Sequence, residues 1–168
     1  MNNTYVQQLF AVLENTTKLH QALYTLANDK REVLVKNDIP KLTELMKSEQ
    51  QLLKAIQQLE AERQNLTTML FQEKGVSVVN GTLLDLIKLS TDIEIKEKLT
   101  GYRDELLRVI GQLQIENELN QQLLGHSLEY VELSLDLFTD RPEEDFIYQH
   151  PGNQPSSQVN RSIINHKA

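Results

Sequence analysis

Hydrophobic residues recur at helical spacing along most of this chain, and the longest run of this pattern extends from Thr91 to Phe138 without a proline. Residues three or four positions apart share one face of an α-helix, so the pattern predicts a single helix about 70 Å long. We expect its first apolar face to pack against other helices of the chain. That face carries Leu99, Tyr102, Leu106, Val109, Ile110, Leu113, Leu124, Leu128, Val131, Leu135 and Phe138.

A second set of apolar residues lies on the opposite side of this predicted helix. Its members are two positions out of phase with the first set, which corresponds to about 200° around the helix axis. The last turns are therefore apolar on two sides, and only one side is needed for packing within the chain. We expect the other side, called the second stripe below, to face a partner. It consists of Ile115, Leu119, Tyr130, Leu133 and Leu137.

Two further long helices are predicted before this one, at about residues 4–36 and 39–74. Between them, Asp38 is expected to cap the second helix, and Pro40 fits only its first turn. This break predicts a tight antiparallel hairpin. In the first helix, apolar residues at seven-residue intervals are typical of coiled-coil packing, namely Tyr5, Val12, Leu19, Leu26 and Val33.

The connections carry recognisable stop and start signals. Gly75 supplies the usual left-handed end of the second helix, and a short helix at about 82–89 is expected to cover one end of the hairpin. Thr91 followed by Glu94 has the Thr-x-x-Glu form of a capping box, which predicts the start of the long helix. A glycine inside a helix costs about 1 kcal/mol relative to alanine, so Gly101 is the position at which the long helix would kink.

These elements predict an all-α fold, an elongated antiparallel helical bundle with coiled-coil-like packing. Residues 1–139 hold three long helices and one short helix, the last long helix at about 92–138. Residues 140–168 hold three of the four prolines and no apolar periodicity, which predicts a flexible tail. Two apolar islands, Phe146-Ile147-Tyr148 and Ile163-Ile164, are typical of short docking segments. An inert solubilising tail is the alternative.

Composition and charge narrow the function classes. The 168 residues carry a net charge of -7, which argues against nucleic-acid binding and against anionic membrane surfaces. No cysteine is present, the first residues lack a signal-peptide pattern, and no apolar window is long enough to insert into a membrane. We expect a cytoplasmic protein whose partner is another protein.

No pattern for catalysis, for a metal or for a cofactor is found in the sequence. The run Gly125-His126-Ser127-Leu128 resembles histidine phosphotransfer bundles, but Glu129 and Tyr130 replace the lysine and glycine of that pattern. A carboxylate beside a phosphoryl group repels it. We therefore interpret His126 as an ordinary surface histidine and keep the phosphotransfer bundle as the least favoured alternative. His20 is interpreted as a bundle residue with a local hydrogen bond.

Two asparagines, Asn117 and Asn120, lie on the first face of the long helix where leucines would be expected. One interpretation is a polar layer that fixes the register of the helices. The other is that packing within the chain ends at this point, and a helix of the partner binds there.

Three segments and the tail together resemble the FlgN family of flagellar export chaperones, over essentially the whole chain. The tail contains a tyrosine and ends in Lys167-Ala168. The segments are residues 49–53 (EQQLL), 59–63 (LEAER) and 117–124 (NELNQQLL). The resemblance implies a cytoplasmic chaperone that binds the C-terminal helices of the hook-filament junction proteins and delivers them to the flagellar type III export gate.

The resemblance and the second stripe lead to specific site predictions. A tyrosine after the last helix docks on the export gate in enterobacterial members, and Tyr148, with Phe146 and Ile147, is the matching position. The main rival function is a coiled-coil scaffold or adaptor that homodimerises through the second stripe. A second copy of the chain, in a weak homodimer, is therefore a further partner to consider. The predicted cargo-binding residues are Asn117, Leu119, Asn120, Tyr130, Leu133 and Leu137.

Overall fold

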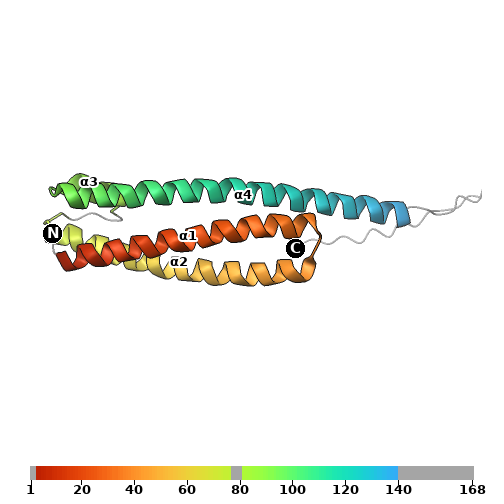
Figure 1. Ribbon diagram of the computed structural model, residues 1–168, viewed down its shortest axis with the longest axis horizontal. Coiled ribbons are helices and arrows are strands. Elements are labelled where there is room, and N and C mark those ends of the chain that lie inside the picture. Colours follow the sequence, from red (N-terminus) through yellow and green to blue (C-terminus); the bar gives the residue numbers. More distant parts are fainter. Residues whose placement is uncertain (1–2, 77–80, 140–168) are drawn as a thin grey trace, which may run out of the picture. The chain divides into compact units, whose positions relative to one another are not determined.

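The computed structural model describes residues 3–76 and 81–139, which form α-helices joined by short connections (Figure 1). Each helix begins and ends within one residue of its predicted range. The all-α class is confirmed. The predicted flexible tail, 140–168, lies outside the described residues. The helices are α1 (Asn3–Val35), α2 (Ile39–Glu73), α3 (Leu83–Leu89) and α4 (Ile93–Thr139).

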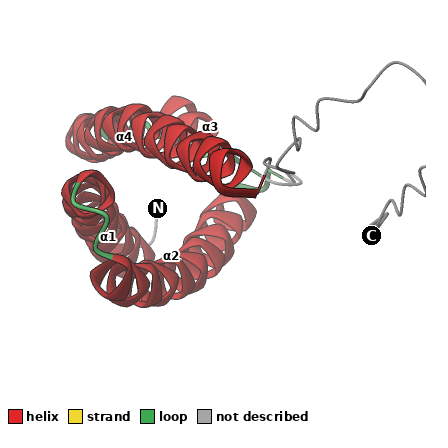
Figure 2. Ribbon diagram, turned by 90° about the vertical axis from the view of Figure 1, so that its right-hand side faces the viewer, coloured by secondary structure: helices red, strands yellow, loops and turns green. Residues whose placement is uncertain are grey.

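The chain divides into two compact units, Met1–Val131 and Glu132–Ala168. The first unit is a helical bundle in which α1 and α2 form an antiparallel hairpin. The fourth helix runs parallel to α1, because Leu99 near its start shares a core cluster with Phe10, whereas Asn120 farther along contacts Ala27. In Figures 1 and 2, α1 lies between α2 and α4 at the hairpin end of this unit.

The hairpin turn has the predicted cap. Oδ1 of Asp38 accepts a hydrogen bond from the backbone N–H of Lys41 at 3.0 Å, and Pro40 occupies the first turn of α2. This bond satisfies one of the N–H groups that a helix start leaves unpaired. Asn37 adopts a φ of +53°, a left-handed conformation that asparagine tolerates better than most residues. The chain therefore reverses direction within three residues, 36–38.

The predicted end of α2 is also confirmed. Gly75 has a φ of +67°, and its N–H donates to the carbonyl of Gln72 at 2.9 Å. The next helix, α3, begins with a capping box that was not predicted. Oγ1 of Thr82 accepts from the N–H of Asp85 at 3.2 Å, and Oδ2 of Asp85 accepts from the N–H of Thr82 at 3.1 Å.

The start of α4 corrects one prediction. Its cap is Asp92, whose Oδ1 accepts from the N–H groups of Glu94 and Ile95 at 2.9 and 3.3 Å. The predicted capping box of Thr91 and Glu94 is therefore wrong, because a carboxylate one residue closer to the helix satisfies its free N–H groups. The helix then continues through Gly101 without ending.

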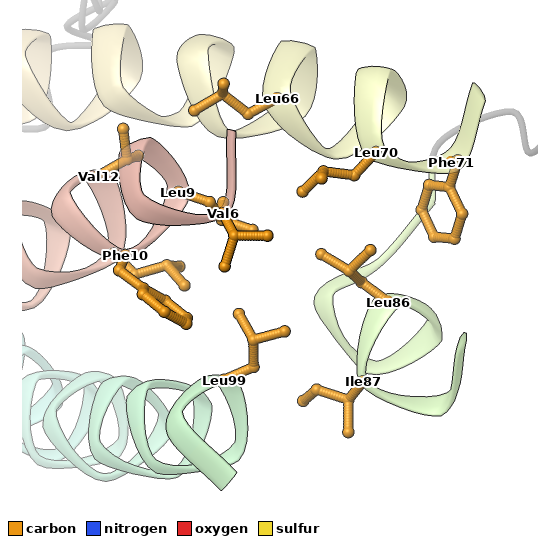
Figure 3. Packing of buried hydrophobic residues seen from close by; sticks show 11 residues of the cluster. Val6, Leu9, Phe10, Val12, Leu66, Leu70, Phe71, Leu86, Ile87 and Leu99 are labelled. Atoms are coloured by element: carbon orange, nitrogen blue, oxygen red, sulfur yellow. The ribbon is translucent and has the colours of Figure 1, made fainter. Parts of the chain in front are cut away.

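The hydrophobic core of the first unit is concentrated where all four helices meet (Figure 3). The ring of Phe10 lies 5.9 Å from that of Tyr102, and Nζ of Lys98 lies 5.7 Å from the Phe10 ring centre. Leu86 and Ile87 bring α3 over this end of the hairpin. Burial of each large apolar side chain contributes about 1.5–3 kcal/mol. The cluster consists of Val6, Leu9, Phe10, Val12, Leu13, Leu66, Leu70, Phe71, Leu86, Ile87 and Leu99.

Replacing Gly81 tests the packing of this core. A Cβ at Gly81 would lie 2.1 Å from Cε2 of the buried Phe71 ring, so we expect Gly81→Ala to destabilise the protein by about 1–3 kcal/mol. The control is Gly101→Ala, where nothing lies within 4 Å of the added Cβ, and it is expected to stabilise by about 0.5–1 kcal/mol. Urea unfolding followed by circular dichroism measures both, and an unchanged midpoint for Gly81→Ala would contradict the first expectation.

Candidate functional site

The first apolar face of α4 is buried only along part of the helix. Leu99 and Val109 are 1% and 0% exposed, whereas Leu124, Leu128 and Val131 are 46%, 59% and 51% exposed. The expectation that this face packs within the chain along its whole length is therefore wrong. The reason is that α1 ends at Val35 and α2 begins at Ile39, so the hairpin turn lies level with these three residues.

The second stripe is exposed wherever its side chains are described. Ile115 and Leu119 are 61% and 39% exposed, and Tyr130 is exposed too. Leu133, in the second unit, is 63% exposed. The predicted cargo-binding residue Leu137 belongs to α4, but its side chain lies outside the description. Several large apolar side chains are therefore available to a partner along this helix.

A charged pair joins α1 to α4 near the middle of α4. Nη1 of Arg31 donates to Oε2 of Glu116 at 3.0 Å, and the Glu116 side chain is 7% exposed. The second carboxylate oxygen, Oε1, lies 2.9 Å from the same nitrogen but has no hydrogen-bond partner. Removing Arg31 would leave the buried Glu116 carboxylate without compensation, so the pair favours one register of the two helices.

Asn120 lies one turn farther along, in the same interface. Its Nδ2 donates to the backbone carbonyl of Ala27 at 2.8 Å, and the residue is 6% exposed. These contacts favour the polar-layer interpretation over a direct contact with a guest helix. Asn117 is half-buried and lines a cleft of about 310 Å³ with Leu42 and Met46 of α2. Cargo binding by the two asparagines stays a prediction.

Glu116 was not predicted as a member of this polar layer. Its position follows the spacing of three and four that connects Val109, Leu113, Glu116, Asn120 and Leu124. Extending that spacing through the charged residue would have identified it. Arg31 carried no comparable signal, because its pairing partner is 85 residues away in the sequence.

A groove of about 560 Å³ lies between the last turns of α1 and residues 119–126 of α4, and we call it the α1–α4 groove. Val35 lines it from α1, and Leu119 and Leu123 line it from α4. Val35 is 70% exposed although it is apolar. A separate cleft of about 160 Å³ at the hairpin turn includes Ile39 and Leu128. Only Leu119 of these residues had been predicted as part of a site.

Charged side chains border the α1–α4 groove. Arg31, Lys36 and Glu32 all line it, and each cation is paired, Arg31 with Glu116 and Lys36 with Glu32. Nζ of Lys36 lies 3.5 Å from Glu32 in an exposed pair.

A second exposed pair lies outside the groove, at the start of α2. The hydrogen bond from Lys41 to Glu44 at 2.9 Å lowers the pKa of Glu44 and raises the pKa of Lys41.

The histidines in the described part of the chain have ordinary surroundings. Nδ1 of His20 lies 2.8 Å from the carbonyl oxygen of Thr16, the local hydrogen bond expected of a bundle residue. The exposed His126 also lines the α1–α4 groove, and its Nδ1 lies 3.4 Å from Oε2 of Glu129. A phosphoryl group on His126 would be repelled by this carboxylate.

The described residues form neither a metal-binding cluster nor a membrane-spanning helix. No group of three or more His, Cys, Asp or Glu side chains is placed to hold a metal ion. Among the four helices, none is both long and apolar enough to cross a membrane.

Comparison with known proteins gives two matches. A family model described as FlgN protein matches residues 1–156. The uncharacterized protein YvyG of Bacillus subtilis (strain 168) is 31% identical over 136 residues, which cover 81% of each chain. No solved structure matches.

Substitutions at Asn120 test the polar layer. Asn120→Ala removes one hydrogen bond and is expected to destabilise the protein by about 1 kcal/mol. Asn120→Asp is expected to cost about 2 kcal/mol more at pH 7, because a buried carboxylate would face the carbonyl of Ala27, which now accepts at 2.8 Å. Urea unfolding at pH 7 and pH 4 measures both variants.

The pH dependence of the aspartate variant has a definite sign. Burial raises the folded-state pKa of the introduced carboxyl above its unfolded value of about 3.9, so the extra loss is complete above the folded pKa and decreases as the pH falls from there to the unfolded pKa. Equal unfolding midpoints for the two variants at pH 7 would show that position 120 is open to solvent.

Proposed function

The chain belongs to the FlgN family, whose members are flagellar export chaperones, and from this premise we propose that it binds the C-terminal helices of the hook-filament junction proteins in the cytoplasm. We further propose that it delivers them to the flagellar type III export gate. The observation that carries the first proposal is the exposed apolar surface of α4.

An exposed apolar stripe on a long helix suits the sequestration of another helix. A cargo helix that needs a coiled-coil partner can place its own apolar face on this stripe, as in helix-in-groove recognition. We assign the contact to Leu119, Tyr130, Leu133 and Leu137, with Asn117 and Asn120 at the point where the buried part of α4 ends. No cofactor takes part in this function.

The size of the stripe suits reversible binding. Burying on the order of 600 Å² of apolar surface would contribute about 15 kcal/mol before costs. Loss of translational and rotational freedom and the ordering of side chains consume much of that gain. Affinities between micromolar and nanomolar values are therefore expected, which suits a cargo that must be released.

The export-gate contact is assigned to the tail. Phe146, Ile147 and Tyr148 are three consecutive apolar residues in it, and Glu143 and Glu144 precede them. A few apolar anchors next to acidic residues suit binding to a pocket with a basic rim. All of these residues lie outside the described part of the structure, and the assignment rests on the sequence and on the family.

Leu133→Asp tests the cargo surface. The side chain is 63% exposed, so a charge there should leave the unfolding temperature within about 2 °C of wild type. Burying that charge under cargo is costly, so we expect at least a tenfold loss of affinity for the C-terminal segment of a junction protein, measured by calorimetry. The control is Leu107→Asp, on α4, where the leucine is 52% exposed and outside the second stripe.

Three outcomes would count against this assignment. Unfolding of Leu133→Asp would mean that the stripe belongs to a packed core. Equal losses of affinity for both variants would mean that any charge on α4 disturbs binding. A stable dimer of the wild-type chain, dissociated by Leu133→Asp, would favour the coiled-coil scaffold that homodimerises through the same surface.

Tyr148→Ala tests delivery separately from binding. If Tyr148 anchors the chain to the export gate, the variant should keep its cargo affinity within about twofold and secrete less junction protein into the culture medium. Gln158→Ala, in the same tail, serves as the control and should secrete normally. Normal secretion by Tyr148→Ala would exclude the anchor role. Loss of cargo binding in Tyr148→Ala would instead place the cargo contact in the tail.

A further inference from the structure

An acidic residue directly precedes each of the four residues of the second stripe that the proposed function assigns to cargo. Neighbouring residues of an α-helix are about 100° apart around its axis, always in the same sense. The four acidic positions therefore lie on the same side of the stripe, and we call them the acidic flank. The pairs are Glu118-Leu119, Glu129-Tyr130, Glu132-Leu133 and Asp136-Leu137.

The negative charge of the acidic flank is not balanced by cations of the same helix. Residues 109–139 contain no lysine and no arginine. Glu118 and Glu132 are exposed, and their carboxylates take part in no ion pair within residues 3–76 and 81–139. The exposed Glu129 lies 3.4 Å from His126, whose ring carries a charge only when it is protonated. The acidic flank thus differs from the α1–α4 groove, where both cations are paired.

The opposite flank of the stripe is uncharged, and at Leu119 it faces α1. Asn120 directly follows Leu119 and donates to the backbone carbonyl of Ala27 on α1. Glu118 lies two positions before Asn120, which is about 200° around α4, so it lies on the side away from α1. The residues that follow the other three assigned positions are uncharged too, namely Val131, Ser134 and Phe138.

We propose that the acidic flank selects a partner helix with lysine or arginine along one side of its apolar stripe, and that it fixes the direction in which this helix binds. The inference rests on the proposed function, which supplies the helical partner. It goes beyond that function by giving a role to residues outside the second stripe and by specifying the charge and the direction of the partner.

The direction follows from the difference between the two flanks. Turning a bound helix end to end on the stripe exchanges the two sides of that helix. A helix with basic residues on one side only therefore meets the carboxylates in one direction and the uncharged flank in the other. Charges beside the apolar seam of a coiled coil determine partner and orientation in the same way. Because single exposed ion pairs are weak, the selection depends on several carboxylates in a row.

The acidic flank also disfavours a second copy of this chain as the partner. A dimer through α4 of both copies would offer these carboxylates no lysine or arginine, because residues 109–139 contain none. In an antiparallel two-fold dimer the acidic flank would face itself, and like charges across an interface are costly.

The test uses the full chain and three synthetic peptides of the last helix of a junction protein. One has the natural sequence, and the other two keep its apolar stripe but carry lysines or glutamates along one side. The wild-type chain should bind the lysine peptide about tenfold more tightly than the glutamate peptide at low salt, measured by calorimetry. The difference should shrink at 0.5 M NaCl, because salt screens exposed charges. Equal affinities at low salt would overturn the inference.

Charge reversal on the chain provides the matching experiment. The double variant Glu118→Lys with Glu132→Lys should bind the natural peptide about threefold to tenfold more weakly and should prefer the glutamate peptide over the lysine peptide. Regained binding of the glutamate peptide would show that the variant is folded. The control is Glu62→Lys with Glu97→Lys, two exposed glutamates outside the acidic flank, which changes the net charge equally and should leave all affinities within about twofold.

A paramagnetic label on the N-terminus of the lysine peptide tests the direction. It should broaden the backbone amide NMR signals near Ile115 or those near Leu133, but not both. Moving the lysines to the other side of the peptide should move the broadening to the other end. Broadening at both ends would contradict a fixed direction.

The remaining outcomes separate this inference from the proposed function. A natural peptide that binds the flank variant and the control equally well would overturn the inference and leave the function intact. A natural peptide that does not bind the wild-type chain would overturn both. Signals of Glu118 and Glu129 that change when the free protein is diluted would assign the flank to a second copy. Displacement of the lysine peptide by a peptide of residues 140–168 would assign it to the chain's own C-terminal segment. Either assignment would overturn the proposal.

Discussion

The structure depends on a difference in length between helices that pack side by side. The hairpin arms α1 and α2 have 33 and 35 residues, whereas α4 has 47. Because α4 packs parallel to α1 and its first turns lie beside those of α1, residues 124–131 of α4 are level with the hairpin turn. The exposed leucines of its later turns follow from this difference, since the first apolar face stays uncovered from Leu124 onward wherever its side chains are described.

The α1–α4 polar layer determines which residues of α4 lie beside the hairpin. Leucine contacts alone tolerate a shift of one helix along the other, but the bonds from Arg31 to Glu116 and from Asn120 to Ala27 form in one register. A shift by one turn would leave the buried Glu116 carboxylate unpaired, which is strongly unfavourable. The layer thus places Leu119 next to Val35 and so defines the α1–α4 groove.

Local features of the fold could be predicted from sequence, and non-local ones could not. Helix ranges, the Asp38 cap and the Gly75 stop depend on a few neighbouring residues, and the structure has them as predicted. The cap of α4 was misassigned because Thr91 and Asp92 are adjacent and both are good capping residues. The exposure of Leu124, Leu128 and Val131 depends on where the hairpin turns, about 90 residues away in the sequence, and no periodicity reports that. The predicted cargo and gate residues remain predictions, and Val35 entered the site only through the fold.

The parallel packing of α4 on α1 has a consequence for the order of folding. The hairpin forms through neighbours in sequence, whereas the bonds that hold α4 to α1 join residues 85 and 93 positions apart. Closing so long a loop costs more entropy than closing the hairpin, so we expect α4 to join a preformed hairpin late in folding. By the same reasoning, we expect α4 to separate from α1 before the hairpin opens under mild denaturing conditions. The helix with the exposed apolar surface would then be the one most weakly held in the bundle. A bound helix would stabilise it by completing its packing.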